Sequence, residues 1–297
     1  MDPILFQDPF LGKEGVFQFT MNHLEQALLF RCPDDFNLGL NAVAIGAYKY
    51  HVTVLAYSLM DNHLHLLLKG SYSSCRSFYH WLVRRLRRML SLRYGVSGLL
   101  REDAYDVSAI TDQDMFLNEV AYILRNPYKA RIASPLSYIW SSADVYFNPL
   151  RDFVRGEALS GMKQERFRAL MQTHETLPGE WEQVNCRILN RCFVDYKTVE
   201  NRFGNSTVYY DRIRKYDLES LVQMSHGLAQ QLRFTDQEMQ EKILSVCRNE
   251  YHVDSYHQLD QKSLLLLAKT LSRRFSCPKK QIGRLLGLSD SLLDQLL

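Results

Sequence analysis

The sequence lacks the features of secreted and membrane proteins. Its six cysteines are scattered, and no two of them form a C-x-x-C pair. Without such pairs or a secretion signal, the cysteines are expected to be reduced thiols. No apolar run approaches the ~20 residues that cross a bilayer. The first residues, MDPILFQDPF, carry two acids and two prolines, unlike a signal peptide. We therefore expect a cytoplasmic protein with no membrane partner.

Internal repeats and low-complexity segments are also absent. The 297 residues, of which 46% are hydrophobic, can form one large domain or two to three small ones. A net charge of +3 alone says little about partners. Changes in pattern predict a first domain over residues 1–148, a helical connecting region over 149–216 and a helical C-terminal domain over 217–297.

The hydrophobic pattern of the first half predicts an α+β fold. We predict strands and helices in the order strand, helix, strand, strand, helix, strand, helix, over residues 16–20, 36–50, 52–59, 63–69, 73–94, 105–110 and 112–126. This is the split βαβ, or ferredoxin-like, order with one added helix, and it implies an antiparallel sheet. The fold alone assigns no function.

Two histidines lie close together on the third predicted strand. His63 and His65 are two residues apart, so both imidazoles leave the same face of the strand. Neutral imidazoles bind Mn, Zn and similar ions and, together with an oxygen ligand, also Mg. The alternative is that both are ordinary strand residues, because the H-x-H pattern often arises by chance.

Tyr122 lies in the second half of the last predicted helix, with Glu119 and Asn126 on the same helix face. A phenol with a pKa of about 10 is mostly protonated at neutral pH, so a nucleophilic tyrosine needs a Lewis acid nearby. A tyrosine at such a position more often packs half-buried against its neighbours. Brought to the two histidines, however, this helix would supply both a nucleophile and an oxygen ligand.

Three spaced motifs resemble those of the REP-associated tyrosine transposases, relatives of the single-tyrosine HUH transposases. The motifs are DNHLHLLL at 61–68, YILRNPYKA at 122–130 and YIWSS at 138–142, similar to PNHVHLLL, YIxxNPVRA and YxWSS. The stretch VFQFTMNHLEQALLF also resembles the opening strand region of that family. The resemblance covers about residues 10–147, roughly half of the chain. Three departures from the pattern remove no catalytic group: Asp61 for a proline, Tyr128 for a valine, and Arg131 where glycine is usual.

The resemblance implies an HUH nuclease domain with a defined chemistry. His63 and His65 would hold Mg²⁺ or Mn²⁺, with Asn126 as an oxygen ligand. Tyr122 would attack a phosphorus of single-stranded DNA, forming a 5′-phosphotyrosine and releasing a 3′-OH. The substrate would be a DNA hairpin of the REP type, and relatives are often homodimers. Two alternatives stay open: a catalytically silent, domesticated DNA- or RNA-binding regulator, and a nuclease of the relaxase or replication-initiator type.

Acidic residues are absent from Cys75 to Arg101, where the chain has seven arginines. Charged faces of helices are commonly only solvated, but they usually mix both signs, and this one does not. An unmixed basic helix suits a phosphate backbone. The residues expected to contact DNA are Arg84, Arg85, Arg87, Arg88, Arg93, Arg125 and Lys129.

The end of the chain has the pattern of a helix-turn-helix, with helices over 279–286 and 290–297. Basic residues could contact DNA phosphates there: Arg273, Arg274, Lys279, Lys280 and Arg284. The second helix, DSLLDQLL, is acidic and rich in leucine, so a helical hairpin that packs against the rest of the chain is the alternative. Nothing in residues 177–297 is expected to be needed for chemistry.

Overall fold

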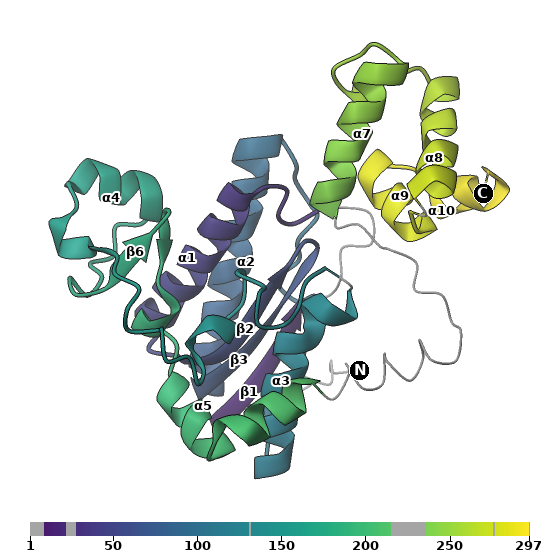
Figure 1. Ribbon diagram of the computed structural model, residues 1–297. Coiled ribbons are helices and arrows are strands. Elements are labelled where there is room, and N and C mark those ends of the chain that lie inside the picture. Colours follow the sequence, from purple (N-terminus) through teal and green to yellow (C-terminus); the bar gives the residue numbers. More distant parts are fainter. Residues whose placement is uncertain (1–8, 22–27, 131, 215–235, 276, 297) are drawn as a thin grey trace, which may run out of the picture.

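The computed structural model describes residues 9–21, 28–130, 132–214, 236–275 and 277–296 (Figure 1). Its sheet is built from β1 (Glu14–Met21), β2 (Thr53–Met60), β3 (His63–Ser71) and β4 (Tyr105–Ile110), with α1 (Pro33–Lys49) and α2 (Tyr72–Tyr94) in the two crossovers. The strands pair antiparallel in the order β2-β3-β1-β4. This order confirms the predicted ferredoxin-like α+β fold.

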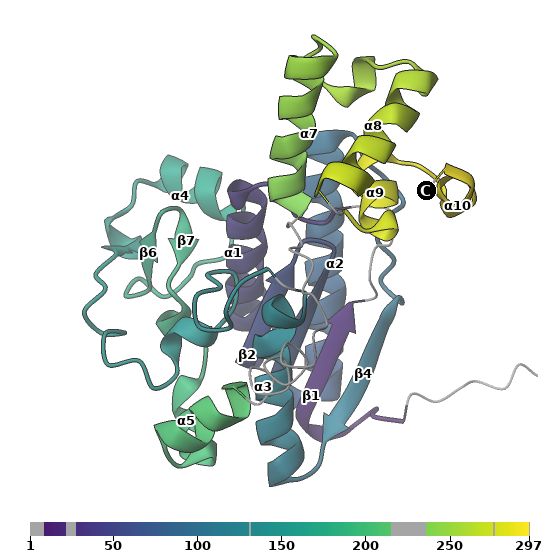
Figure 2. The same ribbon diagram turned by 45° about the vertical axis from the view of Figure 1, so that its right-hand side comes forward.

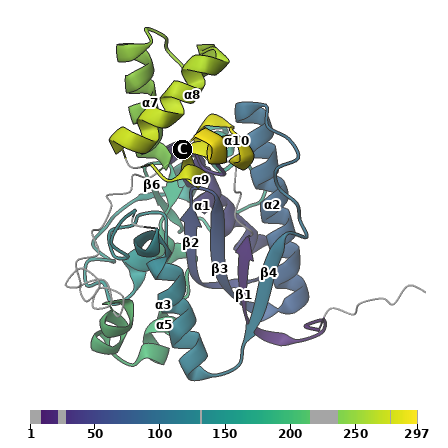
Figure 3. The same ribbon diagram turned by 90° about the vertical axis from the view of Figure 1, so that its right-hand side faces the viewer.

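The two faces of this sheet are covered by different helices (Figures 2 and 3). On one face Phe19 of β1 stacks on Tyr79 of α2, with ring centroids 5.5 Å apart. The next residue along β1, Thr20, points the other way and pairs in register with His65 of β3. That second face is covered by α3 (Gln113–Lys129), whose Tyr122 ring contacts His65. Helices α2 and α3 therefore lie on opposite faces.

The last turn of α3 continues past Asn126, where the sequence predicted its end. Pro127 has no backbone N–H, so the carbonyl of Ile123 loses its usual helical donor. The side chain of Asn126 supplies a substitute, because its Nδ2 donates to Tyr122 O at 3.0 Å and to Ile123 O at 3.4 Å. The helix can therefore include the proline and reach Lys129.

The motif YIWSS covers the outer edge of β2. Backbone bonds join Leu59 N to Trp140 O at 2.9 Å and Ser142 N to Tyr57 O at 3.1 Å. The Tyr138 hydroxyl also donates to Leu59 O at 2.7 Å. These bonds pair an edge strand that would otherwise expose its N–H and C=O groups. A structural role thus accounts for this motif.

The connecting region is not purely helical, so that part of the prediction was wrong. It has α4 (Gln164–Met171) and α5 (Tyr196–Phe203), and residues 206–214 are also helical. The region also contains a second sheet, in the order β5-β6-β7, in which β5 precedes α4 and the other two strands follow it. Its strands are Glu157–Ala158, Glu182–Val184 and Arg187–Ile188. Strands of two or three residues are too short to leave an alternating pattern in the sequence. In the part of the chain that the structure describes, the 3₁₀ turns are η1 (Ala143–Val145), η2 (Leu159–Gly161), η3 (Asn190–Cys192) and η4 (Tyr256–Gln258).

The C-terminal part is helical, as predicted, and has a core of its own. Its helices are α7 (Asp236–Glu250), α8 (Gln261–Phe275), α9 (Lys279–Leu286) and α10 (Asp290–Leu296). Apolar side chains from all four helices form a separate cluster, which also includes Leu28 from the first half of the chain. Within the described residues, no helix combines the length and apolar character that a bilayer crossing requires.

Candidate active site at the histidine pair of β3

The structure brings His63, His65 and Tyr122 together on the α3 face of the sheet. The imidazole rings of His63 and His65 have centroids 5.0 Å apart, with their planes at 84°. The Tyr122 ring stands edge-on to His65, with centroids 5.6 Å apart and planes at 89°. The spacing along the strand predicted the shared face of the two histidines, and packing of α3 on β2 and β3 adds the tyrosine.

Both histidines have a hydrogen-bond partner at Nδ1. The Nδ1 of His63 lies 2.8 Å from Asn62 Oδ1, which can only accept, so this nitrogen donates. The Nδ1 of His65 lies 3.1 Å from Thr20 Oγ1, which can accept in the same way. In that tautomer both Nε2 atoms carry a lone pair. A metal-binding imidazole typically has its other nitrogen donated to a protein oxygen in this manner.

A short chain of polar side chains supports Thr20. Gln18 Nε2 donates to Thr20 Oγ1 at 3.0 Å, and Ser108 Oγ donates to Gln18 Oε1 at 3.1 Å. These residues come from β1 and from its neighbour β4, on the side away from β3. Sequence reasoning missed Thr20 and Gln18, since only the strand register places Thr20 opposite His65, and Gln18 reaches the site through Thr20.

The donor set fits a divalent cation in part. Two imidazoles share one face of the sheet. The Nδ2 of Asn126 donates to carbonyls of its own helix, so its Oδ1 is the atom that could bind a cation. Among the described residues, no group of three His, Cys, Asp or Glu side chains is arranged to hold a metal ion. Further ligands would therefore be water or substrate oxygens, an arrangement that leaves positions for a phosphate.

Little of the histidine pair is exposed to solvent. His63 is 5% exposed and His65 is 1% exposed, whereas Tyr122 is half-buried. A site with little water strengthens any electrostatic interaction made inside it. Access for a DNA strand would therefore have to come with rearrangement of the groups that cover the imidazoles.

Several arginines predicted to contact DNA make bonds within the protein. Arg84 pairs with Glu102 at 2.6 Å, and Arg87 donates to the Leu100 carbonyl at 2.7 Å. Arg93 pairs with the fully buried Asp35 at 3.1 Å. These acids lie outside the stretch from Cys75 to Arg101, so its lack of acids did not leave the face unpaired. DNA contact by these exposed or half-buried arginines stays a prediction.

Arg125 makes a hydrogen bond within the protein, and Lys129 is not described at its side chain. Arg125 is 8% exposed, and its Nη1 donates to the Arg212 carbonyl at 2.9 Å. It therefore joins α3 to the helical residues 206–214, and DNA contact by Arg125 stays a prediction. The side chain of Lys129 lies outside the described residues. Arg88, by contrast, is exposed.

The C-terminal helix-turn-helix has its helices where they were predicted, but one of its basic residues faces inward. Arg284 of α9 makes two bonds of 2.6 Å to the buried Asp236. Lys279 pairs with Asp294 of α10. These pairs favour a hairpin that packs on its own chain, and DNA contact by Lys280 stays a prediction. The side chains of Arg273 and Arg274 lie outside the described residues.

Comparisons with known proteins add little to this geometry. No protein-family model matches the chain, and no curated protein matches it. One similar solved structure is a REP-associated tyrosine transposase bound to a REP hairpin. The match has a TM-score of 0.37 and 16% sequence identity, and it covers 46% of this chain and 81% of the other. A likeness of this size does not establish function.

Proposed function

We propose that this chain nicks and rejoins single-stranded DNA at hairpin sequences through a 5′-phosphotyrosine on Tyr122. The observation that carries the proposal is the contact of the Tyr122 ring with His65, beside His63 on the same face. The motifs that hold these three residues resemble those of the REP-associated tyrosine transposases. The contact of Tyr122 with the histidine pair supports its role as the nucleophile.

A divalent cation, Mg²⁺ or Mn²⁺, would be held by Nε2 of His63, Nε2 of His65 and Oδ1 of Asn126. When bound, it would supply Lewis-acid polarisation of the scissile phosphate. Thr20 and Asn62 would fix the two rings through their Nδ1 atoms. With the Nδ1 atoms held in this way, the Nε2 lone pairs of both histidines point away from Thr20 and Asn62.

The reaction proposed for Tyr122 conserves bonds and charge. Its Oη forms a bond to the phosphorus as the bond from phosphorus to the 3′-oxygen breaks. The phenol gives up one proton, and the leaving 3′-oxygen takes up one proton. Attack by another 3′-OH reverses both steps and joins strands without consuming a nucleotide, because the phosphotyrosine preserves the phosphodiester bond energy.

The test is covalent capture of the intermediate. The protein is incubated with 5′- and 3′-labelled hairpin DNA and Mn²⁺, and adducts are separated on a denaturing gel. We expect an adduct that carries the label 3′ to the nick. Tyr122→Phe should abolish it, whereas Tyr128→Phe on the same helix should not. An adduct that persists in Tyr122→Phe would rule out this nucleophile.

A second candidate function is a binding protein without catalysis on the same fold. The near-complete burial of His63 and His65 favours it, since a working site must admit a phosphate. The same gel separates the two functions. Binding of hairpin DNA with no adduct under any metal condition would exclude the nicking activity and support this alternative.

A further inference from the structure

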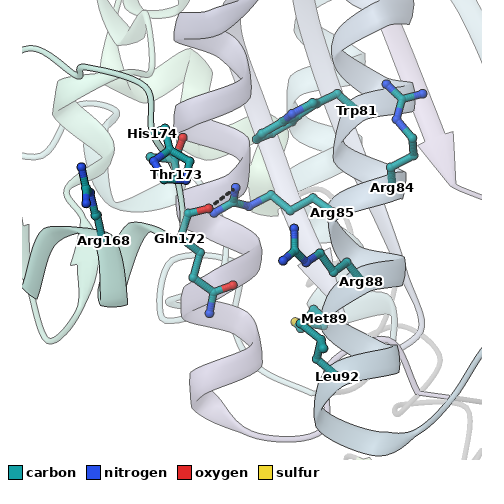
Figure 4. Close-up of a pocket in the computed structure, with 10 residues that line it drawn as sticks. All are labelled: Trp81, Arg84, Arg85, Arg88, Met89, Leu92, Arg168, Gln172, Thr173 and His174. Carbon is teal, nitrogen blue, oxygen red and sulfur yellow. Dashed lines mark hydrogen bonds between the residues drawn. The ribbon is translucent and has the colours of Figure 1, made fainter. Parts of the chain in front are cut away.

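A basic cleft lies between α2 and α4 (Figure 4). The cleft has a volume of about 620 Å³ and is open to solvent. Its cationic and aromatic lining residues come from both helices and the segment after α4: Trp81, Arg84, Arg85, Arg88, Arg168 and His174. Helix α2 and Tyr122 lie on opposite faces of the sheet, so this cleft is not part of the candidate active site.

The charge of the cleft is of one sign. None of its ten lining residues is an aspartate or glutamate. Arg84 has an ion-pair partner in Glu102, but Arg88 and Arg168 are exposed and pair with no carboxylate among the described residues. Like charges gathered in one concavity repel each other and focus a positive potential there. An anionic ligand would relieve that repulsion.

Arg85 forms a fixed base for the cleft. It donates to the carbonyl of Met171 and, at 3.0 Å, to that of Gln172, where α4 ends. Its guanidinium also lies over the Trp81 ring, 5.2 Å from the centroid. Burial, together with the charge of Arg88, lowers the pKa of Arg85 to about 10, so it stays protonated at neutral pH. The cation is therefore held in place before any ligand arrives.

We propose that this cleft binds the phosphodiester backbone of a nucleic-acid strand at a second contact site. One guanidinium group can donate two parallel hydrogen bonds to a phosphate. Arginines that come from two separate segments suit an extended polyanion better than one small ion. The connecting region, through Arg168 and His174, thereby gains a role in substrate binding. The choice of DNA as the ligand of this cleft rests on the proposed function.

The test compares salt dependence of DNA binding among variants of the full chain. Dissociation constants for a hairpin and for unstructured single-stranded DNA are measured from about 50 to 200 mM salt, the range over which phosphate contacts weaken most visibly. Arg88→Ala and Arg168→Ala should each weaken binding several-fold at low salt. Each should also reduce the slope of log K against log salt by about 1.

Matched controls separate charge from structure. Arg101→Ala removes an exposed arginine that pairs with Asp103 outside the cleft, and it should leave affinity and slope unchanged. Arg168→Lys keeps the charge and should retain most of the slope. Thermal unfolding of each variant shows whether the fold is intact, which is expected because Arg88 and Arg168 are exposed.

Three outcomes would overturn the cleft proposal. They are an unchanged slope in the Arg88→Ala/Arg168→Ala double variant, an equal loss in Arg101→Ala, and competition by inorganic phosphate as effective as that by DNA. Failure of the proposed nicking function looks different, because it removes the Tyr122 adduct while slope changes at Arg88 and Arg168 persist. Conversely, an adduct formed normally at saturating DNA with unchanged slopes would retain the nicking function and reject the cleft.

Discussion

Thr20 shows how a residue with no chemistry of its own can prepare a site. Its hydroxyl is 3.1 Å from Nδ1 of His65 and accepts a bond from Gln18. The acceptor supports the tautomer in which Nε2 of His65 can bind a cation. A threonine on a strand is common, so only the pairing of β1 with β3 makes this one visible.

Replacing Thr20 tests whether this bond tunes cation binding. Thr20→Val has nearly the same shape but no acceptor, so we expect Mn²⁺ affinity to fall about 10- to 100-fold, as for other partners of metal-bound histidines. Isothermal titration calorimetry measures the affinity, and the covalent adduct should fall with it at limiting Mn²⁺. Chelation should abolish the adduct in the unmodified protein.

Thr20→Ser restores the hydroxyl and is the matched control. It should bind Mn²⁺ close to the level of the unmodified chain. Equal affinity in Thr20→Val and the unmodified protein would show that the hydroxyl has only a packing role.

At the scale of elements, a polar cluster around Asp35 joins α1 to the end of α2. Asp35 is fully buried, accepts from Tyr94 Oη at 2.7 Å and Arg31 N at 2.8 Å, and pairs with Arg93. Burial and the bond to Asp35 raise the pKa of Tyr94, so its hydroxyl stays protonated and able to donate. Arg93, predicted from the sequence to contact DNA, thus has a structural role.

Arg93→Ala should therefore affect stability more than DNA affinity. The buried Asp35 carboxylate would lose its ion-pair partner but keep two hydrogen bonds, so we expect a loss of about 1–3 kcal/mol in the free energy of unfolding. Urea denaturation followed by circular dichroism measures it. Arg101→Ala, which breaks a fully exposed pair, should leave the free energy of unfolding nearly unchanged. A stable Arg93→Ala protein with weakened DNA binding would contradict this expectation and support the predicted DNA contact.

The basic helix α2 shows which features of these elements could be predicted from the sequence and which could not. The long helices and strands could be predicted because each has apolar residues at regular spacing along its buried face. In the helices this spacing extends over two or more turns, and in the strands over several residues. The partners of the arginine row could not be predicted, since Glu102 and Asp35 lie beyond the basic stretch and reach it only through folding. His63, His65 and Tyr122 could be named because each lies in a local motif.

At the scale of the whole molecule, the C-terminal helices dock beside the candidate active site. The carboxylate of Asp61, two residues before His63, accepts from the backbone N–H of Asp236 at 3.2 Å, where α7 begins. Burial and the nearby Asp236 carboxylate raise the pKa of Asp61 to about 7. The carbonyl of Asp61 also accepts from Leu29 N and Phe30 N. Asp61 therefore links the turn before β3 to the start of α7 and to residues 29 and 30.

Asp61→Ala should loosen the docking of the C-terminal helices. It removes the acceptor at the start of α7, a loss of about 0.5–2 kcal/mol for comparable caps. We expect faster release of the C-terminal part in limited proteolysis. Asp61→Asn keeps an acceptor oxygen and should be released more slowly than Asp61→Ala. Identical cleavage rates in all three proteins would show that this bond does not hold the domain.

The contact between Asp61 and Asp236 also gives the molecule an order of assembly. The two residues are 175 positions apart, so at a translation rate of about 5–20 residues per second, Asp236 emerges roughly 9–35 s after Asp61. During that interval the nascent chain already contains both histidines and, soon after, Tyr122. The candidate active site can thus form on the ribosome while the turn beside it is still open. The C-terminal helices can then dock beside a domain that has already folded.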